Sequence, residues 1–127
     1  MTIKKNATGS GAAPQMANAI IGGVSTTTAG AGTTSLNASL LPLASNHWVT
    51  VGVNNSGVIL PPGNGTGDSL AAGDYMSVIN LTGNTLLVYP PAGGKISTGA
   101  ANASVSLTNG KQATFMCLDG TNYSDDL

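Results

Sequence analysis

The chain has 127 residues and a formal net charge of −1, and only 7% of its residues are charged, against about 25% in an average protein. All four basic residues are lysines and all five acidic residues are aspartates. Four scattered lysines do not form the basic patch that phosphate neutralisation requires, which argues against nucleic-acid binding. The apolar runs are too short for a membrane-spanning helix. Hydrophobic residues make up 41%, enough for one packed domain.

The composition favours strands and turns over helices. Glycine, threonine, asparagine and serine together fill 57 of the 127 positions, whereas glutamate and arginine are absent. Helix surfaces normally use those charged residues, while hydroxyl and amide side chains suit strands and turns. Cys117 is the single cysteine, so no intrachain disulfide is expected. The polar N-terminus lacks the apolar region of a signal peptide, which predicts retention in a cytosol.

The first 35 residues differ in composition from the rest of the chain. They are rich in glycine, alanine, serine and threonine, a mixture that buries too little apolar surface to order alone. Ile20, Ile21 and Val24 form the apolar patch inside this stretch. We therefore expect residues 1–35 to be a flexible N-terminal arm that anchors through this patch, and residues 36–127 to be the folded domain.

Residues 36–127 are predicted to consist of short strands separated by turns. Residues 47–53 alternate, with Val49, Val51 and Val53 expected on one face. The Asn109-Gly110 pair is a strong hairpin signal, and a second hairpin is expected across residues 82–84. The predicted fold class is all-β: an antiparallel β-sandwich or jelly-roll-like domain behind the extended arm. The predicted strands are 47–53, 58–60, 75–81, 85–89, 95–97, 103–108 and 112–118.

The residues that carry chemistry are few. His47 is the single imidazole, and no Gly-x-Ser-x-Gly turn accompanies it, so we interpret it as a strand-end histidine beside Trp48. Cys117 lies in the middle of a predicted strand, which indicates a buried and unreactive thiol. These residues predict a protein without enzymatic activity.

A glycine-rich loop with acidic neighbours raises the question of a metal site. Asn64, Asp68 and Asp74 have the oxygen ligands that calcium prefers, but their spacing does not match the EF-hand loop or the nonapeptide β-helix repeat. Asp and Asn also cap turns without any ion. We therefore predict neither a metal nor a cofactor.

The aromatic side chains have two interpretations. A row of aromatic rings is able to bind sugars, but these five fall on four strands and the C-terminal tail, which favours core and interface positions. The predicted interface residues are Ile20, Ile21, Val24, Trp48 and Tyr89. The five aromatic residues are Trp48, Tyr75, Tyr89, Phe115 and Tyr123.

One stretch of the chain resembles a known family. Residues 78–123 read VINLTGNTLLVYPPAGGKISTGAANASVSLTNGKQATFMCLDGTNY. The strand ending at Asn80, the Gly-Asn turn, the Leu87–Pro90 strand and the Gly93-Gly94-x-Ile96 step resemble a β-segment in small structural proteins of tailed bacteriophages.

The resemblance implies a head decoration (cement) protein on the capsid surface, synthesised in the host cytoplasm. Its implied partners are the major capsid protein and other copies of itself, as a dimer or a trimer. It would bridge neighbouring capsid subunits. A tail-fibre or tail-spike domain is the alternative in the same class, and a carbohydrate-binding module is the alternative from another.

Overall fold

The computed structural model describes residues 24–30, 34–63 and 70–127, which form nine strands and one 3-10 turn, η1. Helical conformation in these residues is confined to η1, so the predicted all-β class is confirmed. The elements are β1 (Val24–Thr28), η1 (Ser35–Asn37), β2 (Ser39–Leu40), β3 (Asn46–Val51), β4 (Ser56–Ile59), β5 (Tyr75–Asn80), β6 (Leu86–Tyr89), β7 (Val105–Leu107), β8 (Gln112–Cys117) and β9 (Tyr123–Asp125).

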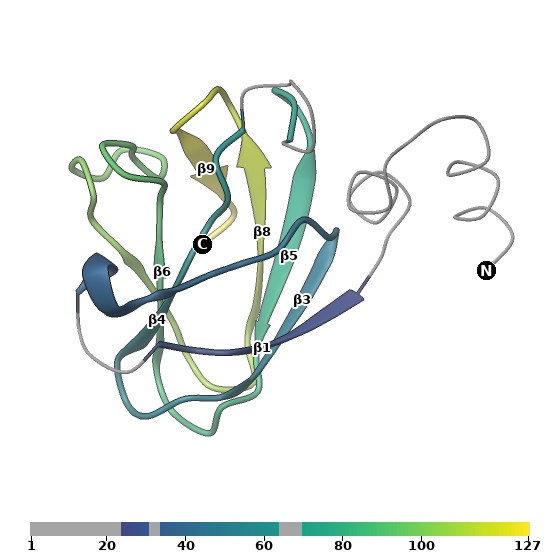
Figure 1. The fold of residues 1–127 in the computed structure, drawn as a ribbon, viewed down its shortest axis with the longest axis vertical. Helices are drawn as coiled ribbons and strands as arrows, with labels where there is room; N and C mark the ends of the chain where they lie inside the picture. The colour runs from purple at the N-terminus through teal and green to yellow at the C-terminus, as the bar shows by residue number, and fades with distance from the viewer. Residues whose placement is uncertain (1–23, 31–33, 64–69) are drawn as a thin grey trace, which may run out of the picture.

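The strands form two sheets between which the chain alternates. Sheet A has the order β1-β3-β5-β8-β9, and sheet B has the order β2-β4-β6-β7. From β1 to β6 every consecutive strand lies in the opposite sheet. Figure 1 shows β3, β5 and β8 side by side in one layer, with β4 and β6 in the other.

The prediction of antiparallel sheets is wrong for most of the pairing. Both sheets are mixed: β1–β3, β3–β5, β2–β4 and β4–β6 are parallel, whereas β5–β8, β6–β7 and β8–β9 are antiparallel. The alternation between sheets is the physical reason. A strand that returns to its sheet after one strand in the other sheet has reversed direction twice, so it runs parallel to its predecessor.

The two predicted hairpins are also wrong. The strands on either side of Asn109-Gly110, β7 and β8, lie in different sheets, as do β5 and β6. The amide of Lys111 donates to the carbonyl of Thr108 over 3.0 Å, and Gly110 has φ +78° while Asn109 is not among the positive-φ residues. A two-residue hairpin of type I′ needs positive φ at both central positions, whereas turns of type I or II splay the strands apart.

The two ends of the described chain contain strands that the sequence patterns did not predict. β1 lies inside residues 1–35, the segment predicted to be an arm, and it pairs with β3 from Val24 to Thr28. Ile20 and Ile21 lie outside the described residues. β9 falls in the predicted polar tail and pairs with β8, placing Tyr123 opposite Cys117.

A β-bulge changes the expected orientation of the valines in β3. Thr27 pairs with Val49 and Thr28 pairs with Val51, so Thr50 is an extra residue in β3. Such an insertion interrupts the alternation of side chains. Val49 is therefore buried, whereas Val51 is 57% exposed, and Val53, beyond the strand, is also exposed.

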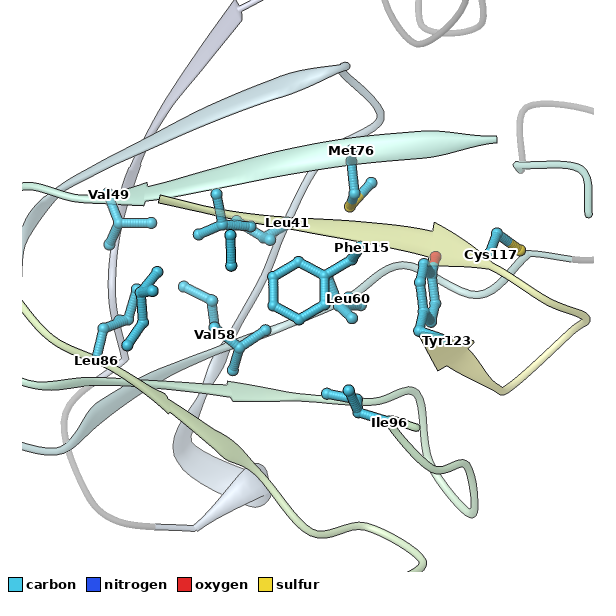
Figure 2. Packing of buried hydrophobic residues seen from close by; sticks show 14 of the residues in the cluster. Leu41, Val49, Val58, Leu60, Met76, Leu86, Ile96, Phe115, Cys117 and Tyr123 are labelled. Atoms are coloured by element: carbon cyan, nitrogen blue, oxygen red, sulfur yellow. The ribbon is translucent and has the colours of Figure 1, made fainter. Parts of the chain in front are cut away.

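One hydrophobic cluster joins the two sheets. It combines Met76 and Phe115 from sheet A with Val58 and Leu86 from sheet B, and all four are fully buried. Figure 2 shows the Phe115 ring in the middle of this cluster, with Val58 and Leu86 on the opposite side from Met76. Apolar burial against both sheets is the main stabilising term of the fold.

A buried asparagine fixes the connections at one end of the sheets. The Asn80 side chain is fully buried, and its Nδ2 donates to the carbonyls of Asn84 and Leu107 over 2.6 and 2.8 Å. Its Oδ1 accepts from the amide of Thr82 over 3.0 Å and from its hydroxyl over 2.7 Å. Asn80 is in sheet A and Leu107 is in sheet B, so this one amide joins both sheets.

We expect Asn80→Ala to lower the free energy of unfolding by about 3 kcal/mol, because it leaves buried carbonyl groups without donors. Urea denaturation monitored by tryptophan fluorescence measures the change. Asn37→Ala is the matched control, since Asn37 is exposed in η1 and its loss is expected to change stability by about 0.5 kcal/mol or less. Equal losses in the two variants would contradict the structural role of Asn80.

Candidate functional site

Among the described residues, no cluster of three or more histidine, cysteine, aspartate or glutamate side chains is arranged to hold a metal. Cys117 is buried, as predicted, and its Sγ lies 3.2 Å from the carbonyl oxygen of Asp119. Burial raises the pKa of the Cys117 thiol, so the thiol is protonated at neutral pH. A buried, protonated thiol is a poor nucleophile.

The side chain of His47, in β3, contacts β1. The side chain is fully buried, and its Nδ1 lies 2.9 Å from the hydroxyl of Ser25 in β1. Its Nε2 has no hydrogen-bond partner among the described residues. Burial lowers the pKa of His47 from 6.5 to about 4, so the ring is neutral at pH 7.

The aspartate near the glycine-rich loop caps a turn. The Asp74 Oδ2 accepts a hydrogen bond from the backbone amide of Ala71 over 2.9 Å. Asn64 and Asp68, its candidate partners for calcium, lie outside the described residues. Asp74 therefore caps a turn, as aspartate side chains commonly do.

The outer side of sheet A carries exposed aromatic side chains. We define the aromatic face as the side of sheet A that bears Trp48, Tyr75, Ile79 and Met116. Trp48 is 48% exposed and Tyr75 is 61% exposed. Trp48 pairs with Ile79 on β5, and Tyr75 pairs with Met116 on β8, so the four side chains lie on two cross-strand rows of the same face.

Two hollows indent the aromatic face, one beside each exposed ring. The hollow at Trp48 has a volume of about 130 Å³ and the hollow at Tyr75 about 340 Å³. Ser77 lines the first and Thr114 lines the second, and these two residues pair with each other across β5 and β8. The two hollows therefore meet at a row of hydroxyl side chains.

The outer side of sheet B carries aliphatic side chains. We define the aliphatic groove as a hollow of about 290 Å³ lined by Leu36, Ile59, Pro90, Ala92 and Asn102. Leu36, in η1, is 93% exposed. Leu40 is 61% exposed and pairs with Ile59 beside the groove. Exposed leucines in such proximity are typical of protein contact sites.

The predicted interface residues are not gathered into one surface. Trp48 is exposed on sheet A, whereas Tyr89 belongs to sheet B and is only 5% exposed. The Tyr89 ring covers Gly57, where a Cβ would lie 2.7 Å from Tyr89 Cε2. The backbone of Val24 begins β1, and Ile20 and Ile21 lie outside the described residues.

The sequence patterns did not single out the other exposed apolar residues. Tyr75 and Ile79 alternate with buried Met76 and Val78 along β5. The alternation of side chains along this strand indicates that Tyr75 and Ile79 lie on the same face. Leu40 had no such signal, because a two-residue strand has no period to detect.

Comparison with protein-family models, curated proteins and solved structures gives no significant match to this chain. Within the described residues, no helix has the length and apolar character needed to cross a membrane.

The buried histidine predicts acid sensitivity. The pKa of His47 is about 4 in the folded chain and near 6.5 when unfolded, so between these values the unfolded chain binds more protons. The free energy of unfolding therefore falls as the pH drops from about 6.5 to about 4, by about 3 kcal/mol. Urea denaturation at pH 7 and pH 4.5 measures the fall.

His47→Gln is the comparison that isolates this effect. Every other titratable group is present in both proteins, so the difference between the two falls belongs to His47. We expect a smaller fall in His47→Gln. The same fall in both proteins would show that His47 is not the source.

Proposed function

We propose that this chain is a non-enzymatic structural protein of a bacteriophage particle, which decorates the outside of the capsid and bridges neighbouring capsid subunits. The observation that carries the proposal is the aliphatic groove with the exposed Leu36 and Leu40 beside it. These side chains offer apolar area to a protein partner. The resemblance of residues 78–123 to phage structural proteins supports the capsid as the partner.

The small number of charged residues limits the interactions that stabilise such a contact. With a net charge of −1 and no arginine, binding rests on apolar burial, at about 25 cal/mol per Å², and on hydrogen bonds of amides and hydroxyls. Contacts with two or more subunits act together, so each contact needs only modest affinity. Screening by salt has little effect on a contact of this kind.

Edge β1 supports contact between copies of the chain. Its outer edge has no strand partner among the described residues, and its sequence, VSTTT, has no charged side chain. Uncharged edges pair readily with other strands. We propose that this edge contributes to a dimer or trimer on the capsid.

In this proposal, the two sheets are the layers of a β-sandwich. Their parallel neighbours differ from the all-antiparallel arrangement of a jelly roll, so the sandwich is the form that we propose. The residues before β1, with Ile20 and Ile21, supply the anchoring arm. A tail-fibre or tail-spike domain remains the alternative location in the same particle.

The number of copies in the particle tests the location. We expect quantitative mass spectrometry of purified virions to give a copy number comparable to that of the major capsid protein, because a cement protein occupies symmetry-related sites all over the shell. A handful of copies that co-purify with tails would overturn the capsid assignment in favour of a fibre or spike domain. Absence from the virion would overturn both.

Substitution of the two exposed leucines tests the contact surface. We expect Leu36→Ser with Leu40→Ser to weaken binding to capsids that lack the chain, by about tenfold or more, since each buried leucine contributes about 1.5–3 kcal/mol. Co-sedimentation with the capsids measures binding. Leu127→Ser is the matched control, because Leu127 is as exposed as Leu40. An equal effect of both changes would contradict the role of the aliphatic groove.

A further inference from the structure

The aromatic face differs in chemistry from the aliphatic groove. The row of Ser77 and Thr114, which carries hydroxyl side chains, lies between the row of Trp48 and Ile79 and the row of Tyr75 and Met116. Ile79 lies four residues after Tyr75 on β5 and pairs with Trp48, so the rings are about 13 Å apart along the strand direction. A protein interface usually has a contiguous apolar centre, which this alternation of rings and polar rows does not provide.

The groups in the Trp48 hollow are uncharged at neutral pH. Gln112 lies in the same cross-strand row as Trp48, because both pair with Ile79, and its side chain is exposed. Ser77 adds a hydroxyl. The hollow's ionisable residue, His47, is neutral at pH 7 because burial lowers its pKa to about 4.

The hollow at Tyr75 adds hydrogen-bond acceptors. Asp125 and Asp126 line it, and each uses one carboxylate oxygen within the protein. Asp125 Oδ1 accepts from the Ser97 hydroxyl over 2.6 Å, and Asp126 Oδ1 accepts from the backbone amide of Thr114 over 2.9 Å. These two bonds hold one oxygen of each carboxylate in place. Among the residues that the structure describes, no lysine lines either hollow.

We propose that the aromatic face binds a neutral polysaccharide. The CH-rich side of a sugar ring is apolar and flat, so it stacks on an exposed aromatic ring, whereas its hydroxyl groups need hydrogen-bond donors and acceptors. Trp48 and Tyr75 each stack on one sugar unit. Gln112 and the Asp126 carboxylate bind the hydroxyl groups. The Asp126 carboxylate, and the absence of lysine from the described residues that line the two hollows, disfavour an anionic chain.

This site is separate from the proposed contact with the capsid. The aromatic face belongs to sheet A and the aliphatic groove to sheet B, and the hydrophobic cluster lies between the sheets. A copy attached through sheet B therefore leaves the aromatic face available. The two proposals fail independently, because each is tested by changes on its own sheet.

Trp48 is the single tryptophan of the chain, so its fluorescence reports directly on the aromatic face. Dextran, mannan and xylan, three neutral polysaccharides, are titrated separately into the full chain at fixed protein concentration. We expect at least one of them to shift the emission to shorter wavelength with a saturable dependence, because stacking removes water from the indole. Alginate, an anionic polysaccharide, is expected to bind at least about tenfold more weakly.

Variants at the second ring separate stacking from a nonspecific effect. We expect Tyr75→Ala to weaken binding by about tenfold and Tyr75→Phe to retain it. Gln112→Ala is expected to weaken it severalfold, and Leu40→Ser, on sheet B, to leave it unchanged. Circular dichroism confirms that each variant is folded.

Three outcomes would overturn the proposal. The first is an unchanged emission with all three neutral polysaccharides. The second is equal binding by Tyr75→Ala and the unchanged protein. The third is a shift that depends on protein concentration without polysaccharide, which would assign the aromatic face to contact with a second copy.

Discussion

The hydrogen bonds of the Asn80 amide are the interaction on which the arrangement of the two sheets depends. Strands that cross between sheets cannot satisfy the backbone groups of their turns by hairpin pairing, so these groups need other partners, and side chains supply several of them. The Asn80 side chain binds the β5–β6 turn and β7. The Nδ2 of Asn84 donates to the carbonyl of Gly52 over 2.9 Å. The Oδ1 of Asn109 accepts from the amide of Gly83 over 2.9 Å. Three connections thus meet in one asparagine network, which gives a physical reason for part of the high asparagine content of the chain.

The positions of the strands were easier to predict from the sequence than their partners. The strands predicted at residues 75–81 and 112–118 correspond to β5 and β8. In both strands buried and more exposed side chains alternate with the period of two that strand geometry imposes. This period does not indicate which strands pair with each other, so the parallel pairing was not predicted. β1 was missed as well, since its polar sequence, VSTTT, has no apolar side to reveal. The hairpin prediction at Asn109-Gly110 was wrong because a glycine with positive φ occurs in several turn types, not only in hairpin turns.

The exposed surfaces were predicted only in part for a related reason. Trp48 follows from alternation with His47 and Val49, both buried. Tyr89 follows the same rule along β6 but is covered on its outer side, since Gly57 leaves room for its ring. Such coverage depends on contacts between distant parts of the chain, which no local pattern contains. The result is a molecule with different chemistry on its two sides: aromatic and hydroxyl-rich on sheet A, aliphatic on sheet B.

The alternation of the chain between sheets also affects how the protein reaches its native state. Only β8 and β9 are joined as a short hairpin among the described strands. Neither β1 nor β2 pairs with the next strand in the sequence: β1 pairs with β3, and β2 pairs with β4. Each such pairing closes a loop before it gains stabilising contacts, and topologies of this kind fold slowly. During that delay the uncharged strands of sheet A are open to pairing with other chains. The yield of native protein therefore depends on the chain concentration during folding, so slow synthesis or dilution favours the native protein over aggregates.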